Sequence, residues 1–254
     1  MKKSPTDLFW NQRVLDETDD TKVNIADTVQ RELELEFVSR NLPSSSNLLE
    51  VGCGNGYATQ RFRDVVRHVD AFDLSENMIA RARQLYGERN NRFFCDNVLT
   101  GEDVAPPYDV IICIRVLINL GGLEEQKVAI QNMASWLRHS GRLILVEGFR
   151  DGFDELNKLR EQAGIEKLNP AEINFYSYVD ALMPTVAKDF TRDEEFHTGM
   201  FDYLTRVVYP ALVGAENATG MSDFHHRIKP LVKVFNPDEF QNLARLRGMV
   251  LTRR

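Results

Sequence analysis

The chain has 254 residues, of which 43% are hydrophobic and 27% charged, so its composition is that of an ordinary globular protein. Its net charge of −7 at pH 7 argues against nucleic acid and anionic membranes as partners, because both would repel it. No apolar run approaches the roughly 20 residues that span a bilayer, and the first residues, MKKSPTDLFWNQ, lack the apolar core of a signal peptide.

Up to about residue 150, short apolar runs alternate with stretches of helical spacing. The helix expected to start at Ser75 has a typical opening, because a serine is followed there by an acidic residue. Strands separated by helices predict a doubly wound, mostly parallel sheet. The expected strands are 47–51, 68–73, 92–96, 108–116 and 142–149, and the expected helices are 26–41, 57–67, 75–86 and 123–141.

The pattern after residue 150 is less regular. We expect helices at 151–165 and 172–190, a strand at 191–198, and an antiparallel edge strand in the closing residues GMVLTRR. Prolines, glycines and a His-His pair mark the stretch before that strand as an insertion. The expected organisation is α/β with seven strands, divided into a cap segment (1–30), a ligand-binding core (31–198), a helical insertion or lid (199–246) and a final core strand (247–254).

The stretch NLLEVGCGNGYAT, residues 47–59, places three glycines directly after an expected buried strand. Such a turn lets a ligand approach the backbone N–H groups at the carboxyl end of the strand. Dinucleotide-binding turns have the spacing G-x-G-x-x-G, and Tyr57 stands where the third glycine would be. The turn therefore indicates a ligand other than a dinucleotide.

Four stretches resemble, in order and spacing, the successive motifs of class I S-adenosylmethionine-dependent methyltransferases of the small-molecule type. They are LLEVGCGNGYAT, VDAFDLSENMIARAR, FFCDNV and YDVIICIRVLINL, and the resemblance covers about residues 30–150. It implies a Rossmann-like sheet, S-adenosyl-L-methionine as the cofactor and S-adenosyl-L-homocysteine as its product. Carboxylates at the strand ends suit a cationic sulfonium better than a pyrophosphate.

The resemblance also implies roles for individual residues. Glu50 and the glycine loop would surround the methionine moiety, Asp73 would accept hydrogen bonds from the ribose hydroxyls, and Asp96 would receive the adenine amino group. The cofactor-site residues implied in this way are Glu50, Gly52, Cys53, Gly54, Asn55, Gly56, Tyr57, Asp73, Leu74, Met78, Asp96, Asn97, Val98, Ile114 and Arg115.

Two features depart from the family pattern. Many small-molecule members carry two histidines after the fourth strand, where this chain has Ile118 and Asn119. Arg115 puts a full charge at the end of the same strand, which is an unusual position for one. It either forms a salt bridge with an acidic neighbour or faces the acceptor and orients an anionic or carbonyl-bearing group.

The acceptor is expected to lie against the additions to the core, namely the cap segment, residues 150–172 and the insertion. We expect catalytic roles for Arg115, for Glu147 at the end of the fifth strand and for His197 as a general base. Residues expected to bind the acceptor are Tyr176, Arg206, Tyr209 and His225. For each of these side chains the alternative is a structural role, such as core packing or a salt bridge.

The sequence therefore predicts methyl transfer to an O or N atom of a small soluble molecule, either anionic or a sugar derivative. The alternatives are a regulator that binds the cofactor without transfer, a protein methyltransferase and, least favoured, a nicotinamide oxidoreductase. Three scattered cysteines predict no metal site and a reduced, cytoplasmic setting, and a homodimer is compatible with the sequence.

Overall fold

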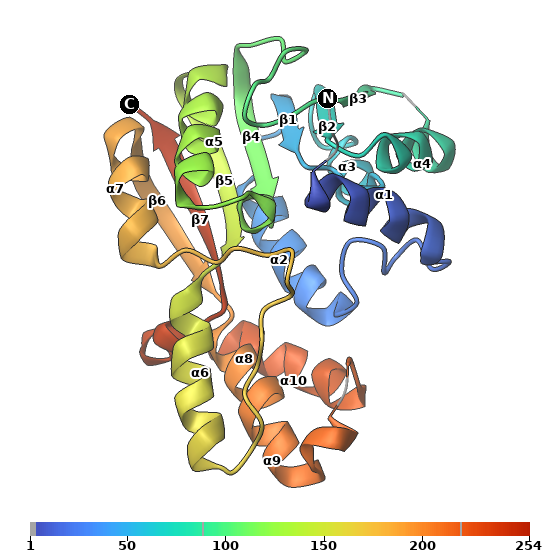
Figure 1. The fold of residues 1–254 in the computed structure, drawn as a ribbon. Coiled ribbons are helices and arrows are strands. Elements are labelled where there is room, and N and C mark those ends of the chain that lie inside the picture. The colour runs from blue at the N-terminus through green and yellow to red at the C-terminus, as the bar shows by residue number, and fades with distance from the viewer. Residues whose placement is uncertain (1–3, 88, 219) are drawn as a thin grey trace.

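The computed structural model describes residues 4–87, 89–218 and 220–254, in which seven strands form one sheet with helices on both faces (Figure 1). The strand order is β3-β2-β1-β4-β5-β7-β6, so the order reverses between β1 and β4. Doubly wound sheets bind ligands at such a switch point. The predicted fold class is confirmed. The strands are β1 Asn47–Val51, β2 His68–Asp73, β3 Asn91–Cys95, β4 Tyr108–Ile114, β5 Leu137–Gly148, β6 Phe190–His197 and β7 Leu246–Arg253.

The antiparallel strand is inside the sheet, so its expected position at the edge is wrong. β7 pairs antiparallel with β5 on one side and with β6 on the other. Residues 246–251 are all buried, as is typical of a strand covered on both faces. β6, whose middle residues Thr191–Asp193 are exposed, forms the edge instead.

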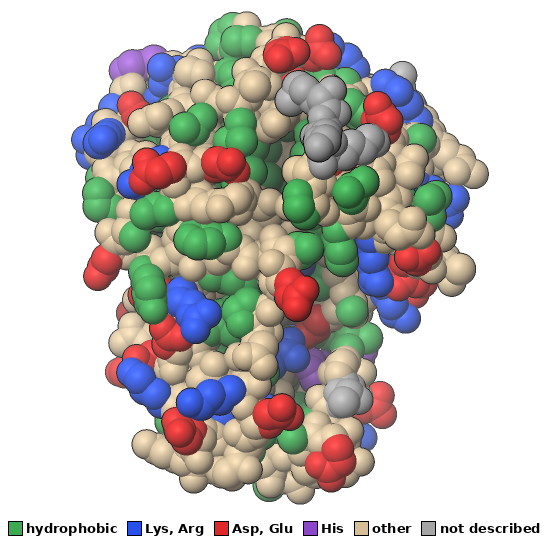
Figure 2. Space-filling view, viewed as in Figure 1, with side chains coloured by type: hydrophobic (Ala, Val, Ile, Leu, Met, Phe, Trp, Pro, Cys, Tyr) green, Lys and Arg blue, Asp and Glu red, His purple; other side chains and the backbone are tan. Residues whose placement is uncertain are grey.

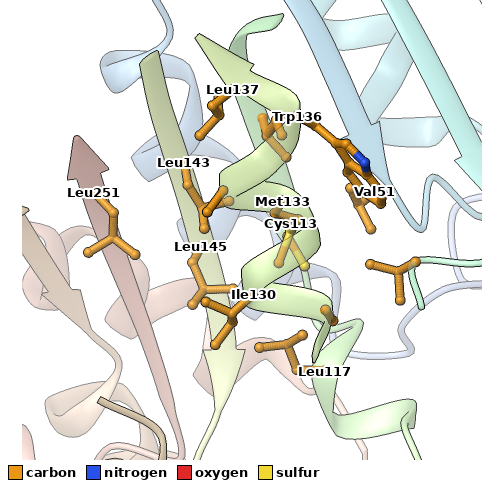
Figure 3. Close-up of a cluster of buried hydrophobic side chains, with 14 of the residues drawn as sticks. Val51, Cys113, Leu117, Ile130, Met133, Trp136, Leu137, Leu143, Leu145 and Leu251 are labelled. Atoms are coloured by element: carbon orange, nitrogen blue, oxygen red, sulfur yellow. The ribbon is translucent and has the colours of Figure 1, made fainter. Parts of the chain in front are cut away.

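Helices cover the sheet in two layers. One face carries α2, α3 and α4, whose apolar side chains pack on residues such as Val69, Val110 and Ile144. The other face carries α5 and α7; in Figure 3, Ile130 and Met133 of α5 lie against Cys113 and Leu145 of the sheet. The helices are α1 Pro5–Asp16, α2 Thr28–Asn41, α3 Tyr57–Phe62, α4 Glu76–Tyr86, α5 Leu123–Trp136, α6 Arg150–Gln162, α7 Val179–Asp189, α8 Gly199–Tyr203, α9 Tyr209–Val213 and α10 Asp223–Val234.

A helical lobe lies beyond the carboxyl ends of β4 and β5 (Figure 1). It contains α6 and the described residues between β6 and β7, including a π-helical turn, η2 Leu204–Val208, and the 3₁₀ turns η3 Ala215–Asn217 and η4 Asp238–Leu243. A further 3₁₀ turn, η1 Leu117–Asn119, follows β4. The lobe packs on α2, where Val29 and Leu33 meet Phe201, Ile228 and Val232. This packing fixes the lobe over the ligand-binding edge of the sheet.

Three expected helices are shorter in the structure by five residues or more. The helix expected at 57–67 ends at Phe62, and the one expected at 123–141 ends at Trp136, because Leu137 pairs with Tyr108 and begins β5. The helix expected at 172–190 begins only at Val179. The residues before it pass η1 after β4, where the Phe175 N–H donates to the Ile118 carbonyl at 2.7 Å.

In the described part of the chain, no helix is both long and apolar enough to cross a bilayer. Figure 2 shows acidic and basic side chains interspersed over one face of the molecule.

Candidate functional site

The loop after β1 requires its glycines. Gly52, Gly54 and Gly56 have φ values of 68°, 55° and 79°, a region that side chains disfavour. A Cβ at Gly52 would lie 2.3 Å from Val116, and one at Gly54 would lie 2.4 Å from the side chain of Asn24. The loop is therefore shaped closely against the end of β4 and against the segment that precedes α2.

Two carboxylates lie beside this loop, that of the buried Glu50 and that of the partly buried Asp73. Asp73 accepts the Gly54 N–H and the Ser75 N–H, each at 2.9 Å, and burial raises its pKa. Glu50 is 4% exposed and accepts the Thr59 hydroxyl, and burial, with Asp73 nearby, raises its pKa to about 8. Among the described residues, no lysine or arginine pairs with either carboxylate. Two acids that no described lysine or arginine neutralises suit a cationic ligand, so these residues fit a sulfonium cofactor.

Asp96 and Asn97 follow β3 and shape the next loop. Asp96 Oδ1 accepts the N–H groups of Asn97 and Glu102, at 2.6 and 3.2 Å, and Oδ2 accepts that of Asp103 at 2.9 Å. Asn97 Oδ1 accepts the Leu99 N–H at 2.9 Å. The expected adenine contact would therefore share a carboxylate that already holds the loop.

We predict that cofactor affinity depends on pH through Glu50. Its raised pKa means that the folded protein holds a proton there at pH 7, and a bound cation would favour the ionised form. The dissociation constant of S-adenosylmethionine should then fall between pH 6 and pH 8, by up to about tenfold per unit. Calorimetry at pH 6, 7 and 8 measures this, and Glu50→Gln should flatten the profile.

The same raised pKa fixes the sign of the stability effect. Between the ordinary pKa of 4.5 and the folded value of about 8, the folded state holds a proton that the unfolded state has lost. The ligand-free protein should therefore lose stability as pH rises through this window, and Glu50→Gln should lose less. An affinity or a melting temperature with the same pH dependence in both proteins would contradict this assignment.

A cavity of about 310 Å³ opens beside the glycine loop, between the carboxyl ends of β4 and β5 and the helical lobe. Asn24, which packs on Gly54, is followed directly by residues that line the cavity, so the loop and the cavity adjoin. The polar side chains of the lining are Asp27, Gln30, Arg115, Asn174, Tyr176, Arg206 and Arg245.

Arg115 forms the ion pair that the first alternative expects, and its side chain also reaches the cavity. Its Nε lies 3.2 Å from Oε2 of Glu34, a fully buried residue of α2, and its side chain also lines the cavity with 20% exposure. Its backbone is left-handed, with φ of 54°, a strained conformation that is often retained at functional sites. Neither terminal nitrogen of Arg115 donates a hydrogen bond within the described part of the chain.

Glu147 lies behind the cavity and not in its lining. Its carboxylate accepts the Leu117 N–H at 2.6 Å and the Gly148 N–H at 2.7 Å, so it holds η1 against the end of β5. Burial raises its pKa to about 7. Its two oxygens already accept backbone groups, so its geometry is that of a structural support.

The candidate histidines lie outside the cavity lining. His197 lines a second cavity of about 260 Å³ near α2 and α10, so its position does not support the expected role as a general base in the first cavity. His225 is buried, its Nδ1 accepts the Ser222 N–H at 3.2 Å, and its Nε2 lies 3.9 Å from Asp27. The neutral ring therefore presents Nε2–H to Asp27. Tyr209 stacks on Phe224 with ring centroids 4.7 Å apart, and neither Tyr209 nor His225 lines the cavity.

Arg245 and Gln30 were not among the expected site residues. Arg245 is one of two arginines in the otherwise apolar run LARLRGMVL, and this was the available signal. Its Nε donates to Asp202 at 2.9 Å, and its Nη2 donates to Gln30 at 3.1 Å.

Comparison with known proteins gives a match to a methyltransferase domain family over residues 49–143. The malonyl-[acyl-carrier protein] O-methyltransferase of Bacillus anthracis is 29% identical over 140 residues, which are 53% of this chain and 51% of that protein. The ubiquinone biosynthesis O-methyltransferase of Xylella fastidiosa is 27% identical over 118 residues, 44% of this chain and 46% of that protein. The chain thus spans about half the length of the curated relatives it matches.

Solved structures share the fold over nearly the whole chain. The N-methyltransferase NodS of Bradyrhizobium japonicum, in complex with S-adenosyl-L-homocysteine, has a TM-score of 0.60 at 15% identity and covers 99% of both chains. Magnesium protoporphyrin IX methyltransferase of Synechocystis, also with this product bound, has a TM-score of 0.60 at 17% identity, covering 98% of this chain and 95% of its own. Residues 49–143 therefore match a methyltransferase domain, and the chain as a whole shares the fold of these two methyltransferases.

Proposed function

We propose that the chain transfers a methyl group from S-adenosylmethionine to a carboxylate oxygen of a small organic acid. The observation that carries the proposal is Arg115, fixed at the end of β4 beside the glycine loop, with both terminal nitrogens directed at no described partner and its side chain in the cavity lining. A planar guanidinium binds a carboxylate through two parallel hydrogen bonds. The Bacillus anthracis relative is named for a malonyl group, which ends in a carboxylate.

S-adenosylmethionine supplies a methyl group on a positively charged sulfur. Glu50 and Asp73 would hold its cationic and ribose portions, and Asp96 with Asn97 would flank its adenine. Glu34 keeps Arg115 in place and offsets its charge. Without that offset, the Arg115 guanidinium and the sulfonium would be two like charges. At a separation of about 4 Å they would repel by roughly 4 kcal/mol at an effective dielectric of 20.

The cavity favours an acceptor atom that carries no proton. Its described titratable lining groups are three arginines, Asp27 and Tyr176. Asp27 is bound to Arg206, and burial raises the pKa of Tyr176, so neither is suited to take up a proton near neutral pH. A carboxylate oxygen can form the new bond to carbon as the carbon–sulfur bond breaks, with no proton released. Oxygen is therefore favoured over nitrogen, and the arginine-rich lining favours an acid over a neutral sugar derivative.

The test is transfer of labelled methyl from S-adenosylmethionine to a panel of small mono- and dicarboxylic acids. We expect a labelled product whose label is released as methanol in alkali, because methyl esters hydrolyse where methyl ethers and methylamines do not. An alkali-stable label would contradict methylation at a carboxylate. Cofactor binding without any transfer would favour the regulator alternative.

A further inference from the structure

Two arginines of the helical lobe share the cavity with Arg115. Arg206 lies in the π-helical turn η2, and Arg245 lies between η4 and β7. Their side chains are 20% and 19% exposed, and both line the cavity. π-helical turns are rare and occur frequently at functional sites. The lobe therefore presents two positive side chains to the space in which Arg115 faces the acceptor.

Each of these guanidinium groups is only partly used by protein partners. Arg206 Nη2 donates to Asp27 at 2.9 Å, while its Nε has no hydrogen-bond partner. Arg245 uses Nε for Asp202 and Nη2 for Gln30. Within the described residues, Nη1 of neither arginine donates to another group. Both side chains therefore have N–H donors beside the cavity that no described protein group accepts.

The two positive charges also lie close enough to oppose each other. The pKa of Arg206 is lowered mainly by its burial and also by the nearby positive charge of Arg245. Like charges in a half-buried site are costly unless an anion lies between them or beside them. Asp27 and Asp202 each offset one charge, and the free donors remain for a further anion.

The three arginines approach the cavity from two sides. Arg115 belongs to the sheet and lies next to the glycine loop, whereas Arg206 and Arg245 belong to the lobe and its connection to β7. We propose that Arg206 and Arg245 form a second anion subsite, so that the acceptor is a short dianion, such as a dicarboxylate. This rests on the proposed function: Arg115 orients the carboxylate that reacts, and the lobe arginines hold the one that does not.

A purely structural role is the competing explanation. Arg206 binds Asp27 at the start of α2, and Arg245 binds Gln30 within it, so both side chains tether the lobe to the core. A tether predicts a loss of stability on substitution but no selectivity between ligands. A subsite predicts that the preference for a second anionic group disappears.

The experiment measures binding of malonate, succinate and glutarate, and of the matching monocarboxylates propionate, butyrate and valerate, to the protein saturated with S-adenosylhomocysteine. By calorimetry we expect the best dicarboxylate to bind at least about tenfold more tightly than its monocarboxylate. Arg206→Gln and Arg245→Gln should reduce this ratio to below about threefold. Arg138→Gln, which removes an exposed ion pair with Asp109 outside the cavity lining, should leave it unchanged.

Arg206→Lys and Arg245→Lys separate a loss of the subsite from misfolding, because lysine keeps the charge but lacks the planar fork. Both variants should retain the melting temperature and lose most of the preference for dicarboxylates. Equal binding of dicarboxylates and monocarboxylates by the unaltered protein would overturn the subsite. So would a preference that survives in folded Arg206 and Arg245 variants. Because these measurements need no methyl transfer, the subsite can fail while labelled transfer succeeds, and the reverse.

Discussion

Replacement of Asp73 by asparagine should weaken S-adenosylmethionine binding by about 100-fold. The carboxylate already accepts the Gly54 and Ser75 N–H groups, and the proposed cofactor pose adds the two ribose hydroxyls. Hydrogen bonds to a charged group contribute about 1.5–3 kcal/mol each, and an amide offers only one acceptor atom. Loss of even one such bond, with a repulsive N–H in its place, accounts for the expected factor.

Asp70 provides the matched control on the same strand. Its carboxylate binds Arg92 and the Tyr108 hydroxyl, at the end of β2 that is remote from the glycine loop. Asp70→Asn should reduce stability and leave cofactor affinity within about twofold. If calorimetry finds the same affinity for Asp73→Asn as for the unaltered protein, the assignment of the ribose site is wrong.

Replacement of Arg115 by lysine should lower kcat/KM for the acceptor by at least about tenfold and leave cofactor affinity nearly unchanged. Lysine keeps a charge for the buried Glu34 but cannot bind a carboxylate through two parallel bonds. The loss should appear in kcat/KM because the guanidinium aligns the reacting oxygen. Steady-state kinetics with the acceptor identified by labelled transfer measures it.

Arg138→Lys makes the same exchange in an ion pair outside the cavity lining and should change neither parameter. If Arg115→Lys impairs cofactor binding and melting temperature while acceptor kinetics stay intact, Arg115 is a structural ion pair and the anionic acceptor is not supported.

The sheet could be predicted from the sequence where its signals are local. The first five strands are apolar runs, separated by helices except between β3 and β4, and the glycines after Val51 lie in a turn whose positive φ values side chains disfavour. The position of β7 could not be predicted in this way, because pairing between β5 and β6 depends on partners far along the chain. The run GMVL is apolar without alternation, which is consistent with the burial of residues 246–251, but it does not say which strands β7 pairs with.

The acceptor cavity was even harder to predict from the sequence, because contacts between distant segments build it. Arg115 was identifiable as an unusual charge at a strand end, but its partner Glu34 lies in α2 among charged residues of similar pattern. Arg206 and Arg245 meet only because the lobe folds back on α2. The helix expected through Phe175 and Tyr176 failed for a similar reason, since this segment bonds to Ile118 at the site edge.

Calorimetric titration of the unaltered protein with S-adenosylhomocysteine and S-adenosylmethionine tests the central claim most directly. Both should bind at one site per chain with micromolar or tighter affinity, and both should raise the melting temperature, because they bind only the folded state. No heat of binding and no shift in melting temperature with either ligand at millimolar concentration would contradict the account.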